Sequence, residues 1–365
     1  MAPPIRVALL GYGLAGAVFH APLLEAVDSL ELAAIVTRND ERRSRARREH
    51  PGAVLLDSAE DVWDRAGELE LVVVASPNRF HVPLARAAVA AGLAVVVDKP
   101  LAARADEARV LVREARERGV LLTIFQNRRW DGDFLTVRRL LETGQLGTVA
   151  RFESRFERWR PQLSGGWRES GDSEDAGGLL YDLGSHLVDQ SLQLFGAAAE
   201  VYAELDARRA GAHTDDDTFV ALSHESGVHS HLWMSAIAAQ QAPRFRVLGT
   251  AAAFTKYGLD VQEEALRDGG DPRDPDWGRE PKEHWGELTT GDETRRIETI
   301  PGAYQRFYEG VVSALREGAP PPVDPDQVVT ALEVLEAAKL AARERQVVRP
   351  SSPGSAAGSP TTGGG

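Results

Sequence analysis

The chain has 365 residues, of which 43% are hydrophobic and 27% are charged, and it contains no cysteine. This length predicts two domains with a core in each, and the missing cysteine excludes disulfides, thiolate metal ligands and cysteine nucleophiles. The net charge of −13 disfavours binding to nucleic acid or to an anionic membrane. No apolar run reaches the roughly 18 residues of a membrane span, and residues 1–5 lack the features of a secretion signal, so we expect a cytoplasmic protein.

The first third of the chain alternates short apolar runs with amphipathic stretches. We expect strands at residues 5–10, 32–37, 71–75, 93–97 and 120–125, and helices up to about residue 27 and from about residue 105 to 118. Nearly continuous Val and Leu runs between helices are typical of a parallel sheet that is covered on both faces. Residues 1–126 are therefore predicted to form a doubly wound α/β domain of the Rossmann type.

After residue 126 the hydrophobic pattern changes to a period of two, which is typical of half-exposed strands. We expect strands at 149–156, 219–223, 228–234 and 244–248, helices at about 179–195 and 327–345, and a long surface loop at 268–287. Residues 127–349 are therefore predicted to form an α+β domain with a largely antiparallel sheet. Residues 350–365 are rich in Ser, Gly and Pro and are predicted to be a disordered tail.

A glycine-rich motif, G-x-G-x-x-G, directly follows the first predicted strand. Gly11 permits a tight turn, Gly13 lets the backbone approach a diphosphate, and Gly16 lets the helix pack on the strand. The backbone amides of Leu14 and Ala15 then lie at the start of the helix, where anions bind. The motif alone would fit a structural turn, but a strand before it and a helix after it predict a dinucleotide site.

The end of the second strand indicates which dinucleotide binds. An NAD site usually has an acidic residue there, which accepts a hydrogen bond from the ribose 2′-hydroxyl. This chain has Thr37 and then Arg38, with Arg42 one turn further on. Because guanidinium groups suit a 2′-phosphate, we expect NADP rather than NAD. A merely solvated basic helix is the alternative interpretation.

The carboxyl ends of two further strands carry polar residues, at the edge where open α/β sheets bind their ligands. The segment after the strand at 71–75, with Ser76, Pro77, Asn78 and His81, is interpreted as part of the nucleotide site, although a proline turn would also explain it.

Asp98 and Lys99 end the next strand and precede a proline. The chain has only four lysines among its 42 basic residues, and the lysine at this sheet edge is predicted to face the cofactor crevice.

Asp182 and His186 are four residues apart on a predicted helix and lie off its apolar stripe. A carboxylate one turn from an imidazole can orient it for proton transfer, although the spacing alone is more often that of an exposed ion pair. His229 and His231 share a strand face with no third ligand, and the acidic run 215–217 fits a turn, so we expect no metal site.

In this order the motifs resemble the glucose-fructose oxidoreductase/inositol dehydrogenase/rhizopine catabolism (Gfo/Idh/MocA) family, and within it most of all the NADP-dependent scyllo-inositol dehydrogenase subgroup. The resemblance covers about residues 4–345. The segments that carry it are VFHAP at 18–22, FQNRRWDGDF at 125–134, YDLGSH at 181–186 and YGLD at 257–260.

The resemblance implies an open mixed sheet in the second domain, often used for homodimer or homotetramer contacts. It implies that Lys99 contacts the nicotinamide side and the reacting hydroxyl, and that His186 is the general acid/base of an Asp-x-x-x-His motif. The resemblance also assigns a nucleotide-lining loop to Pro77, Asn78 and His81. It assigns a pair that approaches the cofactor to Trp167 and Arg168. Asp98 departs from the family, which usually has Glu there.

We therefore expect an NADP-dependent oxidoreductase that acts on a secondary hydroxyl of a small cyclic polyol or sugar, such as an inositol. Arg128, Trp130 and Arg155 are candidate substrate contacts. Two alternatives stay open: a hydride-shuttle enzyme that cleaves glycosides and regenerates its cofactor in each cycle, and a non-catalytic nucleotide-binding redox sensor.

Overall fold

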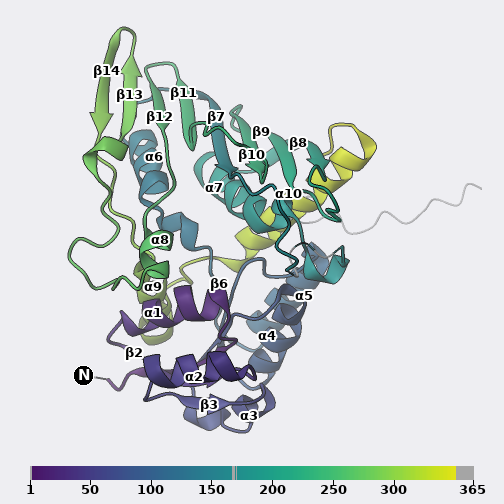
Figure 1. Ribbon diagram of the computed structural model, residues 1–365, viewed down its shortest axis with the longest axis vertical. Helices are drawn as coiled ribbons and strands as arrows, with labels where there is room; N and C mark the ends of the chain where they lie inside the picture. The colour runs from purple at the N-terminus through teal and green to yellow at the C-terminus, as the bar shows by residue number, and fades with distance from the viewer. Residues whose placement is uncertain (1, 167–168, 170, 351–365) are drawn as a thin grey trace, which may run out of the picture.

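The computed structural model describes residues 2–166, 169 and 171–350, and it contains two sheets with helices packed against them (Figure 1). The first sheet has the strand order β3-β2-β1-β4-β5-β6, and every neighbouring pair is parallel. Its strands are β1 (Ile5–Leu10), β2 (Leu30–Val36), β3 (Val54–Leu56), β4 (Leu71–Val74), β5 (Ala94–Val97) and β6 (Leu122–Ile124).

The residues of β4 and β5 are all buried, which explains why these strands are uninterrupted apolar runs. The crossover helices are α1 (Ala21–Glu25), α2 (Asp40–Glu49), α3 (Glu60–Trp63), α4 (His81–Ala90) and α5 (Ala105–Glu117). The predicted Rossmann sheet is confirmed, with the short edge strand β3 as an addition that the sequence pattern did not indicate.

The second sheet has the order β14-β13-β12-β11-β7-β10-β9-β8. Its neighbours are antiparallel except for β7 and β10, so the predicted mixed, mostly antiparallel sheet is confirmed. The strands are β7 (Val149–Glu157), β8 (Ala198–Asp206), β9 (Asp217–His224), β10 (His229–Ser235), β11 (Phe245–Gly249), β12 (Ala253–Lys256), β13 (Gly286–Thr290) and β14 (Glu293–Ile297).

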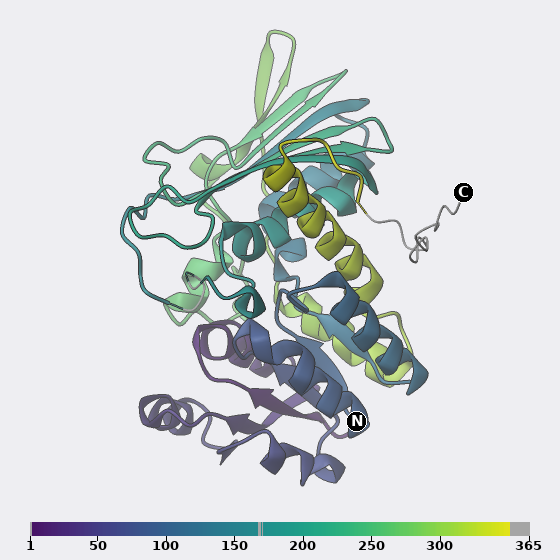
Figure 2. The same cartoon turned by 90° about the vertical axis from the view of Figure 1, so that its right-hand side faces the viewer.

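Helices pack beneath this sheet and connect it to the first one (Figure 2). They are α6 (Gly132–Glu142), α7 (Ser185–Phe195), α8 (Gln262–Arg267), α9 (Gln305–Glu317) and α10 (Pro325–Glu344). Helix α10 contacts α7 and β8 in the second domain and α5 in the first, while α9 contacts α1. The two sheets are therefore joined by the C-terminal helices as well as by the chain at residue 126.

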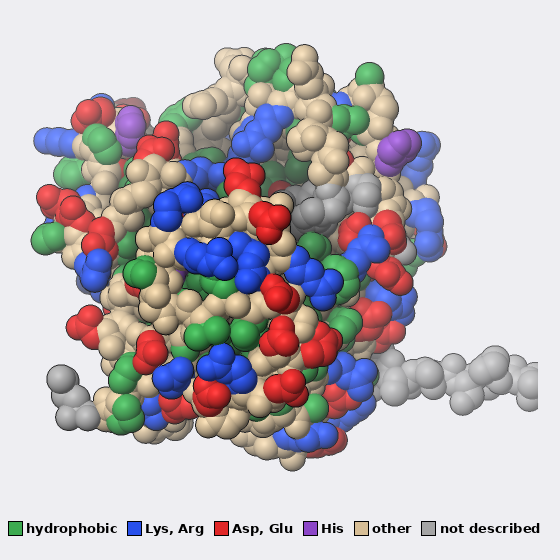
Figure 3. Space-filling model, turned by 60° about the horizontal axis from the view of Figure 1, so that its bottom comes forward, with side chains coloured by type: hydrophobic (Ala, Val, Ile, Leu, Met, Phe, Trp, Pro, Cys, Tyr) green, Lys and Arg blue, Asp and Glu red, His purple; other side chains and the backbone are tan. Residues whose placement is uncertain are grey.

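The surface is chemically mixed. On the face shown in Figure 3, acidic and basic side chains are interspersed rather than gathered into one basic field. No helix within the described ranges is both long enough and apolar enough to cross a bilayer. The predicted disordered tail lies, from residue 351 on, outside the described residues.

Candidate active site

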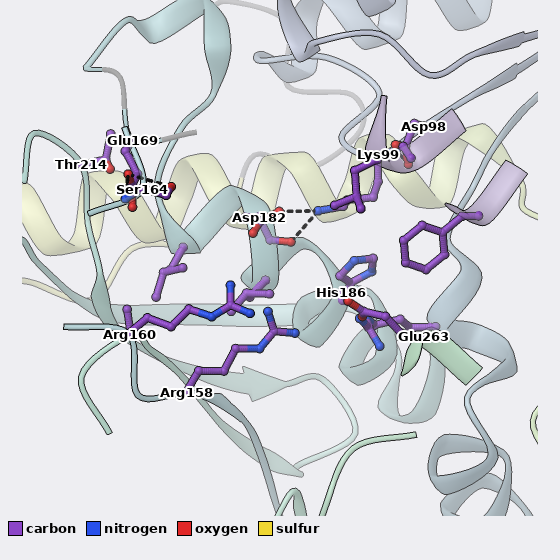
Figure 4. Close-up of a pocket in the computed structure, with 18 of the residues that line it drawn as sticks. Asp98, Lys99, Arg158, Arg160, Ser164, Glu169, Asp182, His186, Thr214 and Glu263 are labelled. Atoms are coloured by element: carbon purple, nitrogen blue, oxygen red, sulfur yellow. Dashed lines mark hydrogen bonds and ion pairs between the residues drawn. The ribbon is translucent and has the colours of Figure 1, made fainter. Parts of the chain in front are cut away.

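A cavity of about 310 Å³ lies where the carboxyl edge of the Rossmann sheet meets the second domain. Leu14 and Ala15 of the glycine loop line it, as do Asp98 and Lys99 directly after β5. His186, from the start of α7, lines it on the side of the second domain (Figure 4). The structure therefore brings residues from Leu14 to Arg267 to one cavity, at the edge where parallel sheets bind ligands.

Lys99 connects the two domains inside this cavity. Its Nζ donates to Oδ1 of Asp182 at 2.8 Å and to the main-chain oxygen of the same residue at 2.7 Å (Figure 4). Asp182 lies in a π-helical turn, Leu180–Gly184, that leads into α7, so the predicted helix at 179–195 starts with a wider turn. This ion pair fixes an ammonium group at the cavity wall, where it can stabilise a developing alkoxide.

The imidazole of His186 is buried, and its Nδ1 lies 3.2 Å from Oε1 of Gln126. Burial, followed by the positive charges of Lys99 and Arg128, lowers the pKa of His186 well below its usual value. The ring is therefore neutral near pH 7. With Nδ1–H donating to Gln126, Nε2 is the basic nitrogen, which is the state that a proton-accepting base requires.

The predicted role of Asp182 needs a correction. We expected its carboxylate to orient the imidazole one turn away, but its oxygen binds Lys99, and the hydrogen bond that orients His186 comes from Gln126. The i, i+4 spacing assumes a regular α-helix, whereas Asp182 lies in the π-helical turn that precedes α7. The carboxylate thus positions the lysine.

The segment after β6 supplies a second wall of the cavity. Arg128 lines it and binds Glu263 at 2.5 Å. Although burial opposes the charged carboxylate, the guanidinium of Arg128 lowers the pKa of Glu263 to about 2. Arg129 makes a buried two-bond contact, of 2.9 and 2.6 Å, with Asp189 of α7. The first pair fixes this segment against α8, and the second fixes it against α7, the helix that carries the imidazole.

Two of the candidate substrate residues lie elsewhere. Trp130 packs edge-on against Phe307 and does not line the cavity. Arg155 lies on the opposite face of β7, with its guanidinium 3.9 Å from the ring centroid of Trp233. Of the three predicted substrate contacts, only Arg128 lines the cavity.

The glycine loop has the shape that a dinucleotide requires. Gly11 has φ = +106°, and a Cβ there would lie 2.5 Å from the oxygen of Ala75. At Gly16 a Cβ would overlap the carbonyl oxygen of Gly11, so this glycine allows the helix to pack on the turn. At Gly13 the nearest atom is Nη1 of Arg42, at 3.6 Å. The backbone at Gly13 is thus open to a close approach, which fits a diphosphate.

The arginines after β2 differ in their contacts. The guanidinium of Arg43 already binds groups of the protein, since it donates to the carbonyl of Thr37 at 2.9 Å and forms an ion pair with Asp57. Within the described part of the chain, Arg38 bonds only through its Nε, which donates to the carbonyl of Asp57 at 2.9 Å. The guanidinium of Arg42 forms no hydrogen bond or ion pair within the described ranges. Arg38 and Arg42 therefore have donors available beside the glycine loop.

The loop after β4 lies next to the crevice, but its Asn78 and His81 side chains bind backbone groups of the protein. His81 lies between the carbonyl oxygens of Pro100, at 2.7 Å, and Ser76, at 2.9 Å, and so connects the loops after β4 and β5. Asn78 donates to the carbonyl of Asp175 at 2.8 Å. Neither side chain lines the cavity. Contacts of this loop with a nucleotide, through Ser76 and Pro77, stay a prediction.

The remaining predicted residues fall into two groups. Trp167 and Arg168 lie outside the described residues. In the acidic run, Asp215 accepts from the amide of Leu180 and from the hydroxyl of Thr218, both at 2.7 Å, so it fixes the start of the π-helical turn. Burial raises the pKa of Asp215. Among the residues described, no group of three or more His, Asp and Glu side chains could hold a metal ion.

Among the residues that sequence reasoning missed are Arg158 and Arg160, which line the cavity, and Gln126, which binds His186. Gln126 follows β6 closely, at the same sheet edge as Lys99 after β5, and this placement was a usable signal. Arg158 and Arg160 continue the period-two pattern of β7 beyond Phe156, the last residue of the predicted strand. Extending that pattern would have placed both arginines on the face of Phe156.

Comparisons with known proteins agree with this arrangement. Residues 5–126 match the family model described as "Oxidoreductase family, NAD-binding Rossmann fold", and residues 138–349 match its "C-terminal alpha/beta domain". The scyllo-inositol 2-dehydrogenase (NADP(+)) IolW of Bacillus subtilis is 37% identical over 94% of this chain and 95% of its own length. The uncharacterized oxidoreductase YdgJ of Escherichia coli is 38% identical over 94% of this chain and 98% of its own.

A solved structure shows the same architecture. The oxidoreductase yvaA of Bacillus subtilis superposes with a TM-score of 0.90 at 36% identity, covering 96% of this chain and 99% of that one. The two-domain fold, the open glycine loop and the matches along nearly the whole chain lead to one conclusion: the protein belongs to the Gfo/Idh/MocA oxidoreductase family.

Proposed function

We propose that the protein is an NADP-dependent oxidoreductase that acts on a secondary hydroxyl of a cyclic polyol or sugar of the inositol type. The observation that carries the proposal is the cavity in which Lys99, held by Asp182, and the neutral imidazole of His186 lie together beside the glycine loop. Support for the substrate class comes from relatives named as inositol dehydrogenases.

The chain's own residues supply binding and proton transfer. Nε2 of His186 accepts the proton of the substrate hydroxyl during oxidation and returns it during reduction. The ammonium group of Lys99 stabilises the negative charge that develops on the same oxygen. Gln126 fixes the imidazole through Nδ1, and Asp182 fixes the ammonium group. Bound NADP would supply the hydride acceptor, with C4 of its nicotinamide as the reactive atom.

The cofactor preference is proposed from the free donors of Arg38 and Arg42 beside the loop that ends β2. A 2′-phosphate offers these guanidiniums charge-assisted hydrogen bonds that a 2′-hydroxyl does not. The relative named as an NADP(+) enzyme supports this preference. A test is the ratio of kcat/KM with NADP to that with NAD, which should fall by about 10-fold in Arg42→Gln, since one such contact is removed.

The decisive experiment follows the absorbance of the reduced cofactor with a panel of inositols and aldoses, using NADP and NAD in turn. The proposal expects polyol-dependent formation of NADPH by the wild type. His186→Ala should lose this activity and still bind NADPH with unchanged affinity. Near-normal turnover by that variant would show that the proton-transfer assignment is wrong.

The same assay separates the two alternatives. Sugar release without net NADPH would favour the hydride-shuttle glycoside-cleaving enzyme. Binding of NADPH with no turnover on any polyol or glycoside would favour the redox sensor.

We also propose that the protein works as a cytoplasmic homodimer or homotetramer, with no nucleic acid or membrane partner. The outer face of the second sheet carries the neighbouring aromatic residues Phe219, His231 and Trp233, and Trp159 at the edge is 58% exposed. Such a face is suited to a second copy of the chain. Light scattering during gel filtration tests this, and a monomeric mass would contradict it.

A further inference from the structure

Among the described residues, six Lys and Arg side chains line the cavity, and four of them bind carboxylates of the protein. The pairs are Lys99 with Asp182 at 2.8 Å, Arg128 with Glu263 at 2.5 Å, Arg267 with Glu263 at 2.8 Å, and Arg209 with Asp216 at 2.9 Å. Each of these four cations therefore has a carboxylate partner within the protein.

Arg158 and Arg160 differ from the other four. In the part of the chain that the structure describes, their guanidinium groups form no hydrogen bond and no ion pair. Figure 4 shows them extending side by side into the cavity, toward Asp182 and His186. Their backbone is fixed, since the amides of Arg158 and Arg160 donate to the carbonyls of Ser235 and Ala236 at 2.8 and 2.7 Å.

The alternation of the strand explains their direction. Phe156, Arg158 and Arg160 are two residues apart and point to the same side, whereas Trp159 points to the other side and is exposed. The guanidinium of Arg158 lies 4.7 Å from the ring centroid of Phe156, which supports it from below. Arg158 is thus a half-buried part of the cavity wall, while Arg160 lies beside it at the exposed rim of the cavity.

The two adjacent positive groups repel each other, and the partial burial of Arg158 increases that cost. Burial lowers the pKa of Arg158, and the charges of Arg160 and Arg128 act in the same direction. The two acids that favour its charged form, Glu263 and Asp182, already bind other cations. A ligand with a negative group would therefore relieve an unfavourable arrangement.

We infer that the substrate carries an anionic group, a carboxylate or a phosphate ester, which Arg158 and Arg160 bind while the reacting hydroxyl lies at Lys99 and His186. Guanidinium groups match the planar carboxylate and the phosphate oxygens with paired hydrogen bonds. The substrate class thus narrows from a neutral polyol to an acidic or phosphorylated one. The inference rests on the proposed function, because it takes the cavity to be the active site.

The cofactor's own diphosphate is the competing anion. Its expected position is at Gly13, and Figure 4 shows the two arginines on the opposite side of Asp182 and His186 from Asp98. This placement favours the substrate as the ligand. Kinetic constants for the substrate and for NADP, measured separately, distinguish the two ligands.

The test compares matched substrates in the wild type, in Arg158→Gln, in Arg160→Gln and in the double variant. One pair is an inositol and its monophosphate, and the other is glucose and glucuronate. We expect the wild type to prefer the anionic member of at least one pair. In each single variant, kcat/KM for that member should fall by about 30-fold, from the loss of a charge-assisted contact. Values for the neutral member and the KM for NADP should change by less than about 3-fold.

Arg155→Gln is the matched control, since it removes an arginine from the same strand on the opposite face. It should leave all of these constants unchanged. A preference for the monophosphate alone would assign a phosphate ester, and a preference for glucuronate alone would assign a carboxylate. Equal activity on the neutral and the anionic member, in the wild type and in the variants, would overturn the inference. An increase in the KM for NADP as large as the loss in kcat/KM for the anionic substrate would also overturn it.

A binding assay separates this inference from the proposed function. The NADPH-loaded protein is titrated with inositol monophosphate or glucuronate while its melting temperature is followed. Stabilisation that is lost in the double variant supports the anion site even if no polyol is oxidised, in which case only the proposed reaction fails. Oxidation of neutral inositols with no such stabilisation would leave the proposed reaction intact and refute the anion site.

Discussion

Replacing Gly13 with alanine should weaken cofactor binding while leaving the stability of the fold nearly unchanged. The new Cβ would meet only the flexible end of Arg42, at 3.6 Å, so it causes no clash inside the protein. The free energy of unfolding should change by less than about 1 kcal/mol, since alanine is tolerated at the start of a helix. At Gly16, in contrast, a Cβ overlaps the carbonyl oxygen of Gly11, and the backbone must shift at a cost of about 3 kcal/mol.

In contrast to its small effect on stability, Gly13→Ala should have a large effect on the affinity for the cofactor. A methyl group at Gly13 keeps the diphosphate away from the backbone amides, and the loss of about two charge-assisted hydrogen bonds raises the Kd for NADPH by about 100-fold. The assay is a titration of NADPH fluorescence together with urea unfolding of the free protein. The reasoning is refuted if Gly13→Ala binds NADPH like the wild type, or if it unfolds as readily as Gly16→Ala.

The remaining predictions concern charge and burial. Lys99→Met should reduce kcat by about 100-fold or more, because one electrostatic stabiliser is removed. In the same variant, NMR titration should show the pKa of His186 rising toward its usual value. An unchanged pKa would show that Lys99 does not act on the imidazole. Arg129→Gln should lower the free energy of unfolding by about 3–5 kcal/mol in urea melts, because it leaves the carboxylate of Asp189 buried and unpaired. A loss of stability below about 1 kcal/mol would contradict this reasoning. Burial lowers the pKa of His20 from 6.5 to about 4, so the unfolded chain binds a proton that the folded chain does not, and stability falls as pH drops from 6.5 to 4. Between pH 7 and 4.5 this histidine accounts for about 2 kcal/mol of that loss. His20→Asn should flatten the dependence by that amount in urea melts at the same two pH values.

The Rossmann domain was predictable because its signals are local. Runs such as Leu71–Val74 are apolar at every position, since both faces of the strand are covered, and the glycine motif lies directly between a strand and a helix. The edge strand Val54–Leu56 was missed because it is only three residues long and half exposed. Short edge strands have little sequence pattern of their own.

The second domain was predictable in class but not in detail. Strands Val149–Glu157 and His229–Ser235 alternate clearly, because one face is buried. Strand Glu293–Ile297 is almost entirely exposed, and its sequence, ETRRI, has no buried face to show. Such hairpins are formed by backbone pairing, which leaves no hydrophobic period to detect.

The candidate site was predicted only in part, because only some of its residues have a local signal in the sequence. Lys99 and His186 belong to motifs with a recognisable position on an element. The partner of His186, Gln126, is separated from it by 60 residues, and only tertiary packing brings the two together. The assignment of Asp182 to the wrong partner shows that spacing along a helix indicates which residues share a face, not which of them bond.

The last helix also sets the order in which the chain can become native during synthesis. Helix α10 ends at residue 344, yet it packs on α5 and β6 of the nucleotide-binding domain, where Glu333 forms an ion pair with Arg109. When residues 1–126 leave the ribosome, that flank of the domain has no cover. The first domain is therefore completed only when nearly the whole chain has been made, and its early form exposes apolar surface that chaperones recognise. A fragment that ends at residue 126 should accordingly bind more of a hydrophobic dye than the full chain does.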